Sequence, residues 1–396
     1  MRLSILLASL LLLVPIAHAL VSAQPPPAGP PFSPAVTAGD FVYLSGMLPT
    51  GADGKVVPGE IGVQTARTLD NLAALLEQHG SRLEQVASVT VYLKRAADFP
   101  AMNEVYARYW PKDPPTRTTV VANLVVPEAL VEISMVALRD GVERRVIHPA
   151  AWMRSPNPYS YGIKSKHTLF LSGLIARNGK DNSFGGGDMK AQTQAVLQNA
   201  TAILAEAGMS LADVVSSRVY ITDTSLFQEM NAVYRQAFPA SPPARATVRC
   251  ALTGPQYLVE ITMVAVKDPT RQAITTPGAD GSAGKANPVL SSAIRVGDRL
   301  YLSGMLGNVE ATRGNAGAQT REALARFSRT LDAAGFAWKD VVDAVVYLPD
   351  LSHFAAMNDA YRATVPAPFP ARATIEAGLV APDGLVEIMM TAIKRK

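Results

Sequence analysis

The sequence predicts an α+β protein built from three tandem domains, each a β-sheet with two helices on one face. The first observation is an internal repeat of about 128 residues, a period that suits whole domains rather than a solenoid. Two strand-like segments recur with this period. The first is "FVYLSGM", which returns as "LFLSGL" and "LYLSGM"; the second is "LVEISMVAL", which returns as "LVEITMVAV" and "LVEIMMTAI". With 48% hydrophobic residues, each domain can bury a core of its own.

The first half of the unit, taken from domain 1, reads as a strand, a turn and a helix. Residues 41–47 are rich in β-branched and aromatic side chains, which favours a strand. "GADGKV" at 51–56 signals a hairpin, because Asp-Gly suits the backbone angles of a tight turn. Apolar residues then recur at helical spacing from Glu60 to about Gln78, and Gly80 suits a C-terminal cap.

The second half reads as a strand, a helix and two strands. Residues 86–93 alternate as a strand, and Asp98 can cap the N-terminus of a second helix. Strand-like segments follow at 118–126 and 130–138. One sheet with both helices on the same face satisfies this order and leaves its other face without a partner. Two further copies lie on the same chain, so three equivalent head-to-tail contacts can close a ring, an intrachain pseudo-trimer.

The domain boundaries follow from the repeat and from polar, proline-rich junctions. The segment 269–286 is rich in Gly, Ala, Thr and Pro, which predicts a flexible linker. The N-terminus has one Arg, an apolar core and then small residues, the pattern of a signal peptide, with an uncleaved anchor as the alternative. The predicted parts are a signal peptide 1–23, domains 28–141, 150–268 and 287–396, and the linker 269–286.

Composition disfavours several function classes. The net charge is only +4 and Lys and Arg are scattered, so nucleic acid is not expected as a partner. None of the five His residues pairs with another at ligand spacing, so we expect no metal. The single Cys250 lies in the apolar run "VRCAL", which favours an inert buried thiol over a reactive one. An exported chain would be soluble, with no membrane contact once its signal is removed.

Polar residues recur at fixed offsets in all three units. A proline-flanked arginine precedes a β-type run in each, as Arg117, Arg245 and Arg372. A glutamate follows on the next strand, as Glu132, Glu260 and Glu387, and a helix asparagine precedes, as Asn103, Asn231 and Asn358. Because Glu132 faces away from the apolar side of its strand among mostly apolar neighbours, it needs a partner or water. The alternatives are an arginine that caps a turn, a structural Arg–Glu salt bridge, and an asparagine that only bonds a loop.

These motifs together resemble the RidA family, also called YjgF-type reactive intermediate deaminases. The carriers are the "SG" strand, the "MN..Y" helix, the "P.R.T" turn and the "VEI" strand, and the resemblance covers nearly all of the chain after the signal. It implies a chorismate-mutase-like fold that normally assembles as a homotrimer, with active sites in clefts between neighbours. Three tandem units would then be that trimer in a single, monomeric chain.

The resemblance also implies roles. The arginines would bind a substrate carboxylate, and the glutamates would position water. We match Arg117 with Glu132, Arg245 with Glu260 and Arg372 with Glu387. Further substrate-binding positions would be Ser45, Gly46, Ser172, Gly173, Ser303, Gly304, the three asparagines and Tyr159. Phe32 and Val289 stand where domain 2 has Tyr159, and "SGM" or "SGL" replaces the family's "SGQ". We therefore expect less polar clefts that differ from one another.

The expected activity is hydrolysis of 2-imino acids, such as 2-iminopropanoate or 2-iminobutanoate, to 2-keto acids and ammonia. A C=N carbon is already electrophilic, so orientation and a placed water suffice and no cofactor is needed. One alternative is a non-catalytic protein that binds carboxylates or acts like a chaperone. Another is the ribonuclease activity attributed to some relatives, against which the export signal and weak charge argue.

Overall fold

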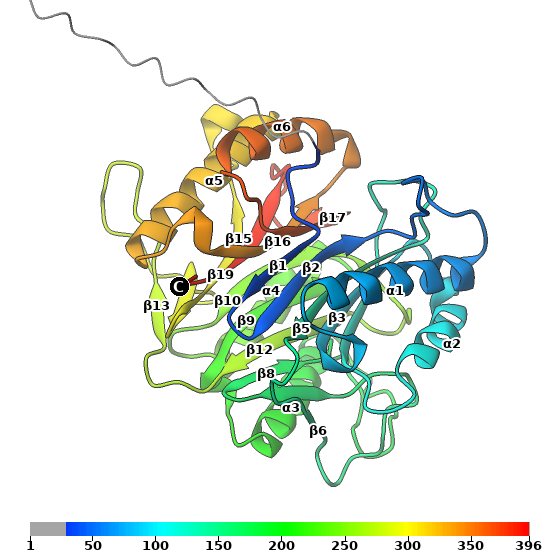
Figure 1. The fold of residues 1–396 in the computed structure, drawn as a ribbon. Coiled ribbons are helices and arrows are strands. Elements are labelled where there is room, and N and C mark those ends of the chain that lie inside the picture. The colour runs from blue at the N-terminus through cyan, green and yellow to red at the C-terminus, as the bar shows by residue number, and fades with distance from the viewer. Residues whose placement is uncertain (1–28, 396) are drawn as a thin grey trace, which may run out of the picture.

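The computed structural model describes residues 29–395 and arranges them as three α+β units around a common centre. The strands lie inside and the helices lie on the outer surface, with the three units coloured in turn from blue to red along the chain (Figure 1). The fold class predicted from the sequence is confirmed.

Domain 1 is one sheet covered by two helices. Its elements are β1 (Ala35–Ala38), β2 (Phe41–Met47), α1 (Ile61–Gln78), β3 (Val86–Leu93), α2 (Phe99–Tyr109), β4 (Thr116–Val121) and β5 (Val131–Leu138). The strand order is β1-β2-β5-β3-β4. Neighbouring strands are antiparallel except β3 and β4, which run parallel because the crossover helix α2 joins them.

Domains 2 and 3 repeat this plan. Domain 2 contains β6 (Arg145–Ile147), β7 (Gly162–Ser165), β8 (Thr168–Leu171), α3 (Met189–Glu206), β9 (Val214–Ile221), α4 (Phe227–Ala237), β10 (Ala244–Arg249), β11 (Ala251–Leu252) and β12 (Val259–Val266). Domain 3 contains β13 (Gln272–Ile274), β14 (Ala293–Val296), β15 (Arg299–Leu306), α5 (Ala316–Ala333), β16 (Val341–Leu348), α6 (Phe354–Thr364), β17 (Ala371–Glu376), β18 (Gly378–Leu379) and β19 (Glu387–Ile393).

Strand exchange at the sheet edges closes the ring. The short strand β11 of domain 2 pairs with β4 of domain 1, and β18 of domain 3 pairs with β10 of domain 2. The third contact is a single bridge from Leu124 of domain 1 to Ile375 of domain 3. Each domain therefore covers the open edge of the domain before it, and the chain forms a pseudo-trimer.

Each sheet separates two apolar layers. On β5, Val131, Ile133, Met135 and Ala137 join the core between the sheet and its helices. Residues on the other face pack against the other domains, as Leu138 does in a cluster that draws side chains from all three units. This alternation is what a strand buried on both faces requires.

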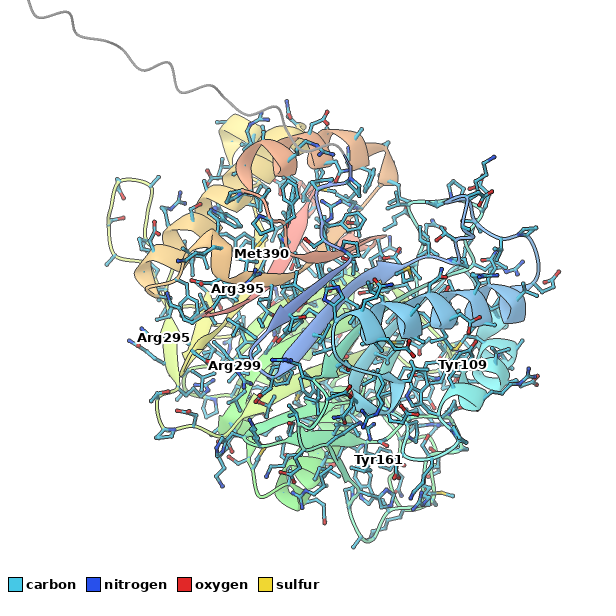
Figure 2. The ribbon with its side chains drawn as sticks, in the orientation of Figure 1. Tyr109, Tyr161, Arg295, Arg299, Met390 and Arg395 are labelled. Atoms are coloured by element: carbon cyan, nitrogen blue, oxygen red, sulfur yellow. The ribbon has the colours of Figure 1, made fainter. Side chains whose placement is uncertain are left out.

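Arg299 marks a point where the three domains meet (Figure 2). This residue of domain 3 lies with its guanidinium 4.7 Å from the ring centre of Phe41 in domain 1. It also donates a hydrogen bond to Thr168 Oγ1 in domain 2. One side chain thus joins all three units.

Most elements lie where the sequence places them, and a few differ. The helix and strand predicted at 60–78 and 86–93 are confirmed as α1 and β3. Gly80 takes φ +70° just after α1, which explains the glycine there. Asp98 stands at the N-cap of α2, but its carboxylate pairs with Arg95 instead of capping the helix. Residues 51–56 form a turn closed by one bridge, Thr50 to Val56, and not a stranded hairpin.

The junctions are more ordered than their composition suggests. The segment expected to be a flexible linker, 269–286, contains β13, which pairs with β14 at the edge of the domain 3 sheet. Similarly, β6 lies before the predicted start of domain 2 and pairs with β7. Within residues 29–395 no helix combines the length and the apolar character needed to cross a membrane. The signal peptide expected at 1–23 lies outside the described residues and stays a prediction.

Candidate active sites

The "SG" dipeptide interrupts its strand in every domain. In domain 1 the β2–β5 register shifts between Leu44 and Met47, and in domain 3 the β15–β19 register shifts between Leu302 and Met305. In domain 2 the same position follows the end of β8, after which pairing resumes with a bridge from Leu174. Because a bulge frees backbone and re-aims side chains, the Ser and Gly of each domain turn toward the neighbouring domain.

The serine hydroxyls hold the domains together. Ser172 Oγ donates to the carbonyl of Ser160 (2.7 Å) and accepts a hydrogen bond from the backbone N–H of Arg117 (2.9 Å). The same pair of bonds occurs at Ser303 toward Arg245 and at Ser45 toward Arg372. Each hydroxyl therefore forms one bond within its own domain and one to the preceding domain, where it positions the backbone of an arginine.

Each arginine faces a glutamate from the next domain around the ring. Glu260 acts electrostatically on Arg117, and the backbone N–H of Thr119 donates a long hydrogen bond of 3.4 Å to Glu260 Oε1. Equivalent contacts join Arg245 with Glu387 and Arg372 with Glu132. We call these sites clefts 1, 2 and 3, after the domain that supplies the arginine.

The pairing drawn from the sequence is therefore wrong in one respect. The glutamate fifteen residues after each arginine belongs to a different cleft, because β3 lies between β4 and β5 in the sheet. Within domain 1, Glu132 is opposite Tyr92 of β3, which separates it from Arg117 on β4. The fixed offset reflects the repeat, whereas the site requires two domains.

The glycine of the dipeptide gives the glutamate its space. A Cβ atom built on Gly173 would lie 1.9 Å from Glu260 Oε1, and the corresponding distances at Gly46 and Gly304 are 1.8 and 1.9 Å. Any larger side chain would collide with the carboxyl group. The glycine is thus explained by close approach, and the carboxyl group lies directly against the bulge.

The arginines are buried against aromatic rings. Arg117 is 96% buried as a residue, and its guanidinium lies 4.8 Å from the ring centre of Tyr106 and 5.9 Å from that of Tyr159. Arg245 packs in the same way on Tyr234 and Phe227, and Arg372 on Tyr361 and Phe32. Burial lowers the pKa of all three guanidinium groups. Among the described residues, Nη1 of each arginine has no hydrogen-bond partner, so each offers a donor to a ligand.

The asparagines differ between clefts. Asn231 Oδ1 accepts from Arg245 Nη2 at 2.8 Å, and Asn358 Oδ1 accepts from Arg372 Nη2 at 2.6 Å. In cleft 1 the equivalent Asn103 instead donates from Nδ2 to Asn157 Oδ1 of domain 2. Clefts 2 and 3 therefore hold their arginine with a side chain that cleft 1 directs elsewhere.

Burial makes the glutamates weak acids. It raises the pKa of Glu260, Glu387 and Glu132 to about 8, against smaller opposing effects of the facing arginine and of a threonine N–H. At neutral pH each carboxyl group is therefore mainly protonated. A protonated carboxyl can first donate a proton and then accept one, which suits general acid–base chemistry.

Cleft 1 opens into a cavity of about 190 Å³ between domains 1 and 2. Its walls include Arg117, Glu260, Gly173 and Tyr159, all of which the sequence had singled out. They also include Arg177 and Tyr257, which it had not. Neither recurs in the other domains, so a search for repeated residues passes over them. The sequence signal that could identify them is a polar residue in one domain at a position where the other two domains have a different residue.

The structure also corrects one equivalence and one expectation. Ser33, Ser160 and Ser291 are equivalent, because the carbonyl of each accepts a hydrogen bond from the serine of its domain's "SG" dipeptide. Tyr159 directly precedes Ser160, so its equivalent in domain 3 is Leu290 and not Val289. The expectation of less polar clefts fails at cleft 1, because Arg177, Gln256 and Tyr257 line it.

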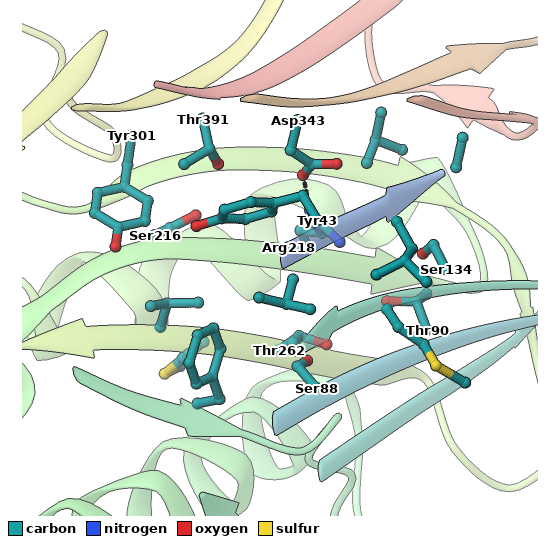
Figure 3. Close-up of a pocket in the computed structure, with 18 residues that line it drawn as sticks. Tyr43, Ser88, Thr90, Ser134, Ser216, Arg218, Thr262, Tyr301, Asp343 and Thr391 are labelled. Atoms are coloured by element: carbon teal, nitrogen blue, oxygen red, sulfur yellow. Dashed lines mark hydrogen bonds and ion pairs between the residues drawn. The ribbon is translucent and has the colours of Figure 1, made fainter. Parts of the chain in front are cut away.

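A second cavity of about 70 Å³ lies at the centre of the molecule (Figure 3). It is lined from all three domains, for example by Tyr43, Phe170 and Tyr301 at equivalent positions. Arg218 of domain 2 and Asp343 of domain 3 form an ion pair of 3.4 Å across it. The cavity contains none of the recurring Arg or Glu residues and is distinct from the clefts.

Comparison with known proteins supports this organisation. A family model described as Endoribonuclease L-PSP matches residues 22–139, 151–267 and 282–394. A RutC family protein of Pyrococcus abyssi is 38% identical over 117 residues, which are 29% of this chain and 91% of the relative. The 3-aminoacrylate deaminase RutC of Acinetobacter baylyi is 40% identical over 119 residues, 30% of this chain and 94% of the relative. Each relative thus corresponds to about one domain.

A solved structure resembles the three-domain arrangement. A chorismatase crystal structure aligns with 78% of this chain and 93% of its own, with a TM-score of 0.52 and 15% identity. At this identity the likeness concerns the fold alone.

Proposed function

Because the chain belongs, in all three of its domains, to the family described as Endoribonuclease L-PSP, we propose that it is an imine and enamine deaminase. Its substrates would be 2-imino acids such as 2-iminopropanoate and 2-iminobutanoate, and its products 2-keto acids and ammonia. The naming of one relative as a 3-aminoacrylate deaminase supports the reaction class. The observation that carries the proposal is the meeting of a buried arginine with a protonated glutamate across each domain interface.

The arginine would bind and orient the substrate. A guanidinium pairs with a carboxylate through two parallel hydrogen bonds, and burial strengthens that pairing. Arg117 Nη1 is buried without a partner among the described residues, so a ligand carboxylate would satisfy it. The aromatic rings on which Arg117 lies keep the guanidinium plane fixed. The imine carbon would then stand next to the bulge and its glutamate.

The glutamate would move protons between water and nitrogen. The neutral carboxyl of Glu260 donates its proton to the imine nitrogen, or to the β-carbon of an enamine, and becomes a carboxylate. The carboxylate accepts a proton from water as the water oxygen bonds to C2. The same group then protonates the amine and takes the hydroxyl proton as the C=O bond forms and ammonia leaves. Each turnover returns Glu260 to its protonated state.

The test is a coupled assay in which an amino-acid oxidase generates the imino acid and the release of 2-keto acid is timed. We expect the protein to accelerate release. Changing all three arginines to alanine should lower kcat/KM roughly 10- to 100-fold, the effect of losing one charged hydrogen-bond pair. Arg295→Ala is the matched control, since Arg295 is exposed and lies over Phe336 outside the clefts.

The two alternatives predict different results. A protein that only binds carboxylates would show ligand-induced thermal stabilisation without faster keto-acid release. The ribonuclease activity contained in the family's description would appear as RNA cleavage and salt-dependent RNA binding. Either result in place of imine hydrolysis would contradict the proposal.

A further inference from the structure

Cleft 1 contains a second arginine at a position where the other two domains have a different residue. Arg177 follows the "SG" dipeptide of domain 2 by four residues, where domain 1 has Thr50 and domain 3 has Asn308. It lines the same cavity as Arg117 and Glu260. Counting this position and the recurring arginine, clefts 1, 2 and 3 carry two, one and one arginines, so clefts 2 and 3 serve as a comparison for cleft 1 within the same chain.

The side chain of Arg177 is held in place by its own domain. Its Nε donates to the hydroxyl of Tyr257 at 2.8 Å, and its guanidinium lies 5.9 Å from the centre of the Tyr257 ring. Tyr257 is itself fixed by an edge-to-face contact with Phe184 at 5.4 Å. Tyr257 is replaced by Ala129 and Gly384 in the other domains, so the arginine and its support occur together.

The two arginines occupy different parts of the cavity. Arg117 lies among Phe99, Tyr106 and Tyr159, whereas Arg177 lies with Tyr257 and beside Tyr161. Among the described residues Arg177 forms no ion pair with a carboxylate. Glu260 is the one carboxyl group among the residues that line the cavity, and burial raises its pKa to about 8, so it balances little of the charge of the two arginines at neutral pH.

We propose that cleft 1 takes ligands with two carboxylates, so that its substrates are 2-imino dicarboxylic acids. Arg117 binds the carboxylate next to the imine, and Arg177 binds the second carboxylate at the far end of the ligand. A monocarboxylate would leave Arg177, which bonds only the neutral hydroxyl of Tyr257 in the cavity, without an anionic partner. Clefts 2 and 3, with Asn308 and Thr50 at this position, would not make that distinction. The proposal rests on the proposed function for its reaction, but its ligand preference can be measured by binding alone.

The experiment measures affinity by titration calorimetry, with 2-oxoglutarate as the dicarboxylate and 2-oxobutanoate as the monocarboxylate. The protein carries Arg245→Ala and Arg372→Ala, so that only cleft 1 keeps its arginine. We expect 2-oxoglutarate to bind roughly 10- to 100-fold more tightly than 2-oxobutanoate, as one additional charged pair provides. Arg177→Asn, which installs the residue of domain 3, should reduce this ratio to about one.

Two control variants sharpen the result. Lys180→Asn removes a positive charge from the same loop outside the cavity and should leave the ratio intact, which excludes a general charge effect. Arg177→Lys keeps the charge and should retain part of the ratio. Equal affinity for the two ligands, or a preference for 2-oxoglutarate that survives Arg177→Asn, would overturn the proposal. Imine turnover measured on the same proteins tests the proposed function separately, because ligand preference requires no turnover.

Discussion

Glu260 is a carboxyl group that faces an arginine and yet remains protonated near neutral pH. Burial in the interdomain cleft penalises its charged form more than Thr119 and Arg117 favour it, which raises its pKa to about 8. Glu132 and Glu387 show the same balance. At the scale of single residues, each repeated unit therefore carries one weak acid whose character depends on the neighbouring domain.

This balance predicts how stability depends on pH. A glutamate whose pKa is raised by folding contributes stability that is full below its ordinary pKa of 4.5 and is lost as pH rises through about 8. The midpoint temperature of thermal unfolding should therefore decrease as the pH is raised from 5 to 9. In a variant with Glu132→Gln, Glu260→Gln and Glu387→Gln, most of that fall should disappear.

Differential scanning calorimetry across this pH range is the measurement. Glu310→Gln is a suitable control, since Glu310 is exposed and its carboxylate pairs with the exposed Arg313. An unchanged pH dependence in the triple variant would show that these carboxyl groups ionise normally in the folded protein.

At the scale of elements, the bulge at the "SG" dipeptide is the feature that joins fold and site. It removes Ser172 and Gly173 from the ladder, and the serine then bonds the Arg117 backbone while the glycine leaves room for Glu260. Regular pairing through this point would keep both residues in the ladder and away from the neighbouring domain. The local irregularity is thus part of the interdomain contact.

Gly173→Ala tests this arrangement. The new Cβ would lie 1.9 Å from Glu260 Oε1, so the carboxyl must move away from the bulge. We expect the imine turnover of cleft 1, measured with Arg245→Ala and Arg372→Ala present, to be lost, and the free energy of unfolding to fall by about 1–3 kcal/mol.

Gly62→Ala is the matched control for that substitution. In helix α1 the added methyl group meets Val105 Cγ2 at an ordinary 3.4 Å. It should leave turnover unchanged and raise stability by about 0.5–1 kcal/mol, because alanine favours a helix. Full turnover in Gly173→Ala would mean that the position of Glu260 against the bulge is not needed.

At the scale of the whole molecule, three non-identical domains form a ring that a homotrimer would form from identical ones. The central cavity shows the difference (Figure 3). Arg218 stands where domains 1 and 3 have Thr90 and Val345, and Asp343 stands where domains 1 and 2 have Ser88 and Ser216. The ion pair occurs once and joins domain 2 to domain 3. Three identical subunits would have the same residues at every interface, so they could not form such a pair at one interface alone.

Removing one member should leave the other buried and unpaired. Arg218→Val, which installs the residue of domain 3, should destabilise the protein by about 3 kcal/mol. The double variant Arg218→Val with Asp343→Ser should recover to within about 1 kcal/mol of the original, since a matched neutral pair carries no unpaired charge. Thermal midpoints of the three proteins provide the comparison. If the double variant were as unstable as the single one, the loss of stability would come from losing the ion pair and not from leaving one charge unpaired.

The sequence by itself determined the fold class, the threefold repeat and the identity of the recurring Arg, Glu, Asn, Ser and Gly positions. These features depend on local periodicity and on comparison within one chain, which need no coordinates. The tertiary structure alone decided that Arg117 meets Glu260 and not Glu132, because the pairing depends on which strands separate them and which domain comes next. It likewise brought together Arg177 and Tyr257, which do not repeat and become neighbours in the cavity only through the fold. Residue types follow from the sequence, whereas a site between domains is a property of how their surfaces meet.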